Sequence, residues 1–129
     1  MVIDTSAVIA ILRAEPDADR LIAALAAAPD RRMSTASVLE SCMVMQARFG
    51  DAGEREVDTF LQRLRVDVIP FTEDHLHLAR SAFRRFGKGR HPAALNFGDC
   101  FAYALAVSLD EALLFTGEEF SRTDVRSAA

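Results

Sequence analysis

Short apolar runs alternate along the chain with longer segments whose apolar residues recur at the spacing of an α-helix. The short runs predict strands at residues 1–3, 32–35, 66–69 and 113–115. The longer segments predict helices at residues 7–12 and 16–29, one ending at 45, others around 57–64 and 79–86, and a last at 99–109. Strands that alternate with helices are typical of a parallel sheet covered on both faces. We therefore predict an α/β fold with a central parallel sheet flanked by helices.

Glycines and prolines mark the expected boundaries between these elements. Gly50 and Gly53 are predicted to separate the third helix from the fourth, and residues 87–98, which hold three glycines and Pro92, are predicted to form a loop. The segment 99–109 is apolar nearly all round, which predicts a buried central helix.

Length and composition narrow the class of protein. The 129 residues suit one domain, and a chain that is 50% hydrophobic and 26% charged has enough apolar surface for a packed core. There is no apolar run of 18 residues and no basic leader with a cleavage site, so we expect a cytoplasmic protein without membrane contact. Cys42 and Cys100 lack metal-type spacing and are interpreted as reduced core thiols.

Three carboxylates stand in unusually apolar surroundings. Asp4 follows Met1-Val2-Ile3, while Glu40 and Asp99 lie in stretches without a nearby Lys or Arg. A buried carboxylate is costly unless it is paired, hydrogen-bonded or bound to a metal. Because sites in parallel sheets gather beyond the carboxyl ends of the strands, one divalent cation could stabilise all three.

Helix capping is the alternative for each of these acids. Asp4 could cap the first helix, and the pairs Ser37–Glu40 and Asn96–Asp99 have the form of capping boxes. The two interpretations are compatible, because helix N-termini favour anions.

Four motifs together resemble the PIN-domain family and, within it, the VapC ribonuclease toxins of bacterial toxin–antitoxin pairs. The motifs are Met1-Val-Ile-Asp-Thr-Ser-Ala7, Ser37-x-x-Glu40, the stretch Leu95-Asn-Phe-Gly-Asp-Cys-Phe-Ala-Tyr-Ala-Leu105, and the closing segment from Leu113 to Val125. The third is the most specific, and the order and spacing of the four cover nearly the whole chain.

The resemblance implies a Mg²⁺-dependent endoribonuclease, with Mn²⁺ as a substitute, that cleaves RNA to inhibit translation or growth. By motif match Asp4, Glu40 and Asp99 take the metal-binding and catalytic roles. A fourth acid is expected after the last strand, and we assign it to Glu118, with Glu119 as the rival. The residues expected to support the site, with helix capping as the alternative role, are Thr5, Ser6 and Asn96.

The resemblance also implies partners. VapC-type toxins usually form homodimers and are held inactive by a small VapB-like antitoxin that covers a groove and reaches the site with a basic side chain. The apolar residues that could make such contacts, if they are not core, are Leu21, Leu25, Met43 and Met45.

A local basic stretch could bind RNA phosphates although the formal net charge of the chain is −4. No acid lies between His75 and Gly98, and the residues expected to contact RNA are Arg84, Arg85, Lys88 and Arg90, with Arg80 nearby. A solvated helix face is the alternative interpretation.

Other classes of function remain open. A magnesium-dependent phosphatase also places an Asp after the first strand, although the haloacid-dehalogenase type needs a second Asp where this chain has Ser6. A cyclising ribonuclease would act through histidines, which here are His75, His77 and His91, and would need no metal. A non-catalytic binding module would keep the acids only as helix caps.

Overall fold

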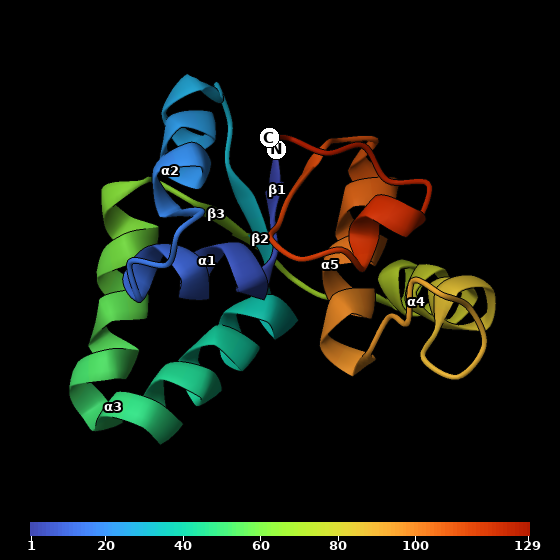
Figure 1. Cartoon of the computed structure of the whole chain (residues 1–129), viewed down its shortest axis with the longest axis horizontal. Coiled ribbons are helices and arrows are strands. Elements are labelled where there is room, and N and C mark those ends of the chain that lie inside the picture. Colours follow the sequence, from blue (N-terminus) through green and yellow to red (C-terminus); the bar gives the residue numbers. More distant parts are fainter.

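The computed structural model describes residues 1–129, and it consists of a small sheet between two layers of helices (Figure 1). The strands are β1 (Val2–Ile3), β2 (Arg32–Ser34), β3 (Asp67–Ile69) and β4 (Leu113–Leu114). The helices are α1 (Thr5–Leu12), α2 (Ala18–Ala27), α3 (Thr35–Arg63), α4 (Glu73–Phe86), α5 (Phe97–Leu109) and the 3₁₀ turn η1 (Phe120–Arg122). None of the helices is long and apolar enough to cross a membrane.

All four strands are parallel, in the order β3-β2-β1-β4. Successive strand residues point to opposite faces, so each face has its own core. Val2 and Leu113 pack with α4 and α5, whereas Ile3 and Leu114 pack with α1, α2 and the second half of α3. The predicted α/β fold with a central parallel sheet is confirmed.

The last long helix also follows its prediction. Helix α5 buries Ala102, Tyr103 and Leu105 and lies against α4. It begins at Phe97, two residues earlier than predicted, because Asn96 caps it and places Asp99 within its first turn.

Helix α3 departs from the prediction at one of its two glycines. Gly50, with φ of 67°, makes the predicted break and folds the second half of α3 back. Gly53 lies inside the helix instead, and its missing Cβ leaves room for the Met45 carbonyl of the first half of α3. It is therefore a site of close packing and not a boundary.

The two cysteines differ in environment. Cys100 is buried, as predicted, whereas Cys42 is partly exposed on α3, so its assignment to the core is wrong. The neighbouring Met43 on the same helix is 63% exposed, which shows that this side of α3 faces solvent.

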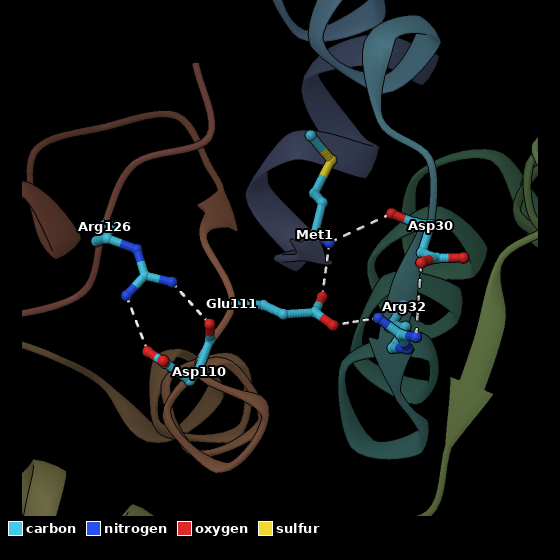
Figure 2. A network of polar contacts seen from close by, with 6 residues as sticks. All are labelled: Met1, Asp30, Arg32, Asp110, Glu111 and Arg126. Carbon is cyan, nitrogen blue, oxygen red and sulfur yellow. Dashed lines mark hydrogen bonds and ion pairs between the residues drawn. The ribbon is translucent and has the colours of Figure 1, made fainter.

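The amino ends of the strands are closed by ionic contacts (Figure 2). The Met1 ammonium donates to Oε2 of Glu111 at 2.6 Å, and Arg32 donates to the other oxygen of the same carboxylate. Arg126 donates to the Asp110 carboxylate at 2.9 Å and so ties the C-terminal segment to the end of α5. The opposite, carboxyl ends of the strands are left for a site.

Candidate active site

Asp4 lies where β1 ends and α1 begins. Its Oδ2 accepts a hydrogen bond from the Ser6 amide at 2.9 Å, so Asp4 does cap α1 as the alternative interpretation required. Its Oδ1 is buried and has no hydrogen-bond partner, and the residue is only 2% exposed. Burial raises the pKa of this carboxyl to about 7, with smaller contributions from the charges of Asp99 and Glu40.

Asp99 is held at the start of α5 by a capping box. The Asn96 amide donates to Asp99 Oδ2 at 3.0 Å, and the Asp99 amide donates to Asn96 Oδ1 at 2.9 Å. The pKa of Asp99 is raised to about 6, mainly by burial and to a smaller extent by the charges of Glu119 and Glu40. The expected cap therefore exists, and it fixes the Asp99 side chain beside other acids.

Glu40 approaches this cluster from α3. Its carboxylate lies so close to Gly98 that a Cβ at that position would collide with it. Gly98 therefore allows the Glu40 side chain to lie against the first turn of α5, next to Asp99. This glycine was not predicted as a site residue, although its place just before Asp99 in an apolar motif was a usable signal.

The predicted capping box of Ser37 and Glu40 does not form. Helix α3 begins earlier, with Ser34 as its cap, and Ser34 Oγ accepts from the Ala36 amide at 3.3 Å. Ser37 is instead fully buried inside the first turns, and its hydroxyl has no partner. Sequence alone could not show this, because two serines of equal capping propensity stand three residues apart.

The two candidates for the fourth acid face different neighbours. Glu118 pairs with Arg122 at 3.7 Å and is largely exposed. Glu119 is the one whose charge acts on Asp99. The structure thus brings Glu119, the rival candidate, toward the acid cluster.

Thr5 and Ser6 connect α1 to its neighbours. Thr5 Oγ1 donates to the Ser37 carbonyl at 3.1 Å, and Ser6 Oγ accepts from the Thr116 amide at 3.1 Å. Both hydroxyls therefore hold together the three segments that carry Asp4, Glu40 and Glu119.

The donor set fits a hard divalent cation. Asp4, Glu40 and Asp99 offer carboxylate oxygens, and the unpartnered Asp4 Oδ1 is a buried acceptor of the kind that a cation would satisfy. No three His, Cys, Asp or Glu side chains are arranged as a complete metal centre in this structure. Binding would therefore draw the carboxylates closer together.

The basic side chains of the segment between His75 and Gly98 lie in different environments. Arg85 pairs with Asp124 at 3.0 Å, and the Arg90 guanidinium lies 5.6 Å from the centre of the Phe83 ring. Lys88 is exposed in the loop after α4. Of the residues expected to contact RNA, Arg85 is therefore engaged by another segment of the chain, whereas Arg84, Lys88 and Arg90 are exposed.

Two of the three histidines serve local structure, and His77 is exposed on α4. His75 is 6% exposed, and its Nδ1 accepts from the Thr72 amide in the capping box of α4. His91 Nδ1 accepts from the Ala93 amide at 3.0 Å. Neither arrangement favours a histidine-based ribonuclease.

Comparison with known proteins agrees with this geometry. The PIN-domain model matches residues 1–126. Ribonuclease VapC30 of Mycobacterium tuberculosis is 52% identical over 129 residues, which cover 100% of this chain and 98% of that protein. Ribonuclease VapC of Mycolicibacterium smegmatis is 54% identical over 125 residues, 97% of both chains. The chain therefore belongs to the PIN-domain family and, within it, to the VapC ribonucleases.

Solved structures share the fold at low sequence identity. VapC20 of Mycobacterium tuberculosis, a toxin that cleaves the sarcin–ricin loop, superposes with a TM-score of 0.76 at 18% identity, covering 97% of this chain and 98% of that one. A VapBC2 complex from Rickettsia felis, bound to promoter DNA, gives a TM-score of 0.72 at 15% identity over 98% and 94% of the two chains.

The raised carboxyl pKa values predict an unusual pH dependence of stability. Asp4 binds its proton more tightly in the folded state, where its pKa is about 7 against 3.8 unfolded, so its contribution is present below pH 4 and is lost as pH rises through 7. In EDTA, the free energy of unfolding should fall between pH 5 and pH 8. Asp4→Asn should remove a large part of this fall, to which Asp4 contributes at most about 3 kcal/mol between pH 5 and its pKa of about 7.

Urea denaturation at several pH values measures the effect, and Asp58→Asn, at an exposed acid on α3, is the control. An equal slope in Asp4→Asn and the unmodified protein would contradict the assignment of this pH dependence to Asp4.

Proposed function

We propose that this chain is a Mg²⁺- or Mn²⁺-dependent endoribonuclease that acts in the cytoplasm as the toxin of a VapBC-type pair. The observation that carries the proposal is the buried, unpartnered Asp4 Oδ1 close to the charges of Glu40 and Asp99. Such an arrangement costs stability unless a cation neutralises it. Membership of the VapC ribonucleases supports RNA as the substrate.

Each acid has a distinct place in the proposed mechanism. Asp4 and Asp99 are the proposed ligands, held by caps that fix their side chains, and Glu40 and Glu119 complete the cluster from α3 and from the segment after β4. A bound divalent cation supplies Lewis acidity for hydrolysis of a phosphodiester. We propose Glu119 as the fourth acid, because Glu118 is paired with Arg122.

We propose Lys88 and Arg90 as the main RNA contacts of the basic stretch. Both lie exposed in the loop after α4. That loop returns to the acid cluster through a bridge between Gly87 and Leu95, just before α5. Phosphates bound there would lie on the approach to Asp99.

We propose that the antitoxin occupies an apolar groove of about 270 Å³ between α1, α2 and the second half of α3. Ile11, Ile22 and Phe60 line it, and Glu56 and Arg63 lie at its rim. Helix α1 runs from Asp4 to this groove over about 12 Å, at 1.5 Å per residue. A helix seated in the groove, followed by a few extended residues, could therefore reach the acids with a basic side chain.

Most of the apolar residues considered for partner contacts are core. Leu21, Leu25 and Met45 are at most 2% exposed, and only Met43 is open to a partner. Leu25 does contribute to the floor of the antitoxin groove.

We propose that a second copy of the chain covers the other apolar groove, of about 730 Å³, between α4 and α5. Phe97 is 80% exposed there, next to Leu76 and Phe83. Helix α4 has acids in its first turn and arginines in its last turn. Two copies of α4 packed antiparallel about a two-fold axis would therefore place Glu73 of each against Arg84 of the other.

The first test concerns the metal. Asp99→Asn removes a proposed ligand but keeps a side-chain oxygen that can accept from the Asn96 amide, so the protein should fold. Its Mn²⁺ affinity and RNA cleavage should fall at least 10–100-fold, because substitutions of residues that only orient metal ligands already cause losses of this size. Isothermal titration and a cleavage assay measure both losses. Asp19→Asn, on the exposed side of α2, is the control. Retained cleavage in folded Asp99→Asn would exclude the ligand role.

The second test concerns the products. Hydrolysis by a water that expels the 3′-oxygen leaves a 5′-phosphate and a 3′-hydroxyl. Mass spectrometry of fragments from total RNA identifies the ends and locates the cleavage site. A 2′,3′-cyclic phosphate would instead mean attack by the ribose hydroxyl and would contradict the proposed chemistry.

The third test concerns the second copy. Glu73→Arg and Arg84→Glu should each weaken self-association, because each places like charges together across the two-fold axis. The double variant should restore it. Sedimentation at several concentrations measures this, and Glu54→Arg is a control on α3. A monomer in the unmodified protein, or no recovery in the double variant, would overturn this interface.

A further inference from the structure

The segment 116–124, which carries Glu119, is attached at both ends. At its start the Thr116 amide donates to Ser6 Oγ at 3.1 Å, beside Asp4. In its middle Phe120 is buried, with its ring 5.3 Å from that of Phe115. At its end lies Asp124, which attaches the segment on the side of Phe120 away from Thr116.

Asp124 is held by two side chains that also bind each other. The Tyr103 hydroxyl donates to Asp124 Oδ1 at 2.7 Å, and Arg85 Nη2 donates to Asp124 Oδ2 at 3.0 Å. Arg85 Nη1 donates to the Tyr103 oxygen at 3.3 Å. The three groups thus form a closed set of hydrogen bonds between α4, α5 and the C-terminal segment.

The electrostatics agree with a strong contact. Burial tends to raise the pKa of Asp124, but the hydrogen bonds from Tyr103 and Arg85 outweigh it and hold that pKa below its usual range. Burial, reinforced by Asp124, raises the pKa of Tyr103 to about 12. At neutral pH Asp124 is therefore ionised, Tyr103 keeps its proton and Arg85 keeps its charge.

Helix α5 connects this contact to the acid cluster. Asp99 and Tyr103 are four residues apart, so they lie one turn apart on the same side of the helix. One rigid element thus carries both the acid and the anchor of the segment that brings Glu119 toward it. The Glu119 carboxylate lies back over Gly117, where a Cβ would collide with it, and the adjoining Thr116 amide is bonded to Ser6 Oγ close to Asp4. The segment therefore carries Glu119 on the side of the acid cluster.

We propose that Tyr103, Asp124 and Arg85 form a clamp that positions Glu119 beside Asp99. The inference rests on the proposed function, since it assigns these three residues to the same acid site. It also gives Arg85 a positioning role in place of the predicted contact with RNA. The clamp touches neither substrate nor cation, and its effect passes through residues 119–124.

The test is a double-mutant cycle on Mn²⁺ affinity, measured by isothermal titration. Tyr103→Phe should weaken binding by about 10-fold, as expected of residues that orient ligands. Glu119→Gln should weaken it at least as much. The double variant Tyr103→Phe/Glu119→Gln should be no weaker than Glu119→Gln alone, because the clamp would have no acid left to position. Unchanged affinity in Tyr103→Phe, or losses that simply add, would overturn the proposal.

Two further variants separate positioning from general destabilisation. Arg126→Ala breaks the contact with Asp110 beyond the clamp, so it should lower Tm but leave Mn²⁺ affinity unchanged. Asp124→Asn replaces Tyr103→Phe if that variant fails to fold, and it should give the same loss of affinity. Equal loss in Arg126→Ala would indicate a loosened segment and contradict a specific clamp.

Kinetics distinguish the clamp from an RNA contact. Arg85→Ala should lower kcat and leave KM for RNA unchanged, whereas a lost phosphate contact would raise KM. If Asp99→Asn abolishes Mn²⁺ binding while Glu119→Gln and Tyr103→Phe do not affect it, the clamp is wrong and the proposed function stands. If Asp99→Asn also leaves binding unchanged, the proposed function fails.

Discussion

The structure is organised around carboxylates that are crowded at the carboxyl ends of parallel strands. Asp4 is nearly inaccessible to solvent, and one of its carboxylate oxygens has no hydrogen-bond partner. The negative charges of Glu40 and Asp99 also repel its own charge. Such a group is tolerated only where the surrounding elements are well fixed. The two apolar cores on either face of the sheet provide that support, and Thr5 and Ser6 tie α1 to the segments that carry the other acids.

Charge is divided between the two ends of the sheet. At the amino ends, Glu111 is neutralised by Arg32 and the Met1 ammonium. At the carboxyl ends, Asp4, Glu40, Asp99 and Glu119 have no basic partner among the ion pairs of the structure, whereas Glu118 pairs with Arg122 and Asp17 pairs with Arg20. Much of the positive charge that the sequence offers near α5 is used elsewhere, as the pairing of Arg85 with Asp124 shows. The site therefore keeps its negative potential, which is what attracts a cation.

The sequence predicted the parts of this arrangement that depend on local pattern. An apolar run followed by Asp4, and a nearly all-apolar helix begun by Asn96 and Asp99, are readable because strand ends and helix caps have short-range signatures. Which of Glu118 and Glu119 faces the acid cluster depends on the turn after β4. Which of Ser34 and Ser37 caps α3 depends on where that helix begins. Neither is set by the neighbouring residues in the sequence. The pairing of Arg85 joins segments 39 residues apart, so no local rule could reveal it.

The capping of Asp4 and Asp99 explains how these acids can be accommodated in the fold when the proposed cation is absent. Each carboxylate uses one oxygen to accept a backbone amide at a helix start, where the partial positive charge of the helix end offsets part of its cost. The other oxygen remains for a ligand. An asparagine at either position could accept the same backbone amide and would remove the repulsion between the acids. Retaining the acids therefore costs stability, which is consistent with the proposed capacity to bind a cation and is the pattern expected of a functional site.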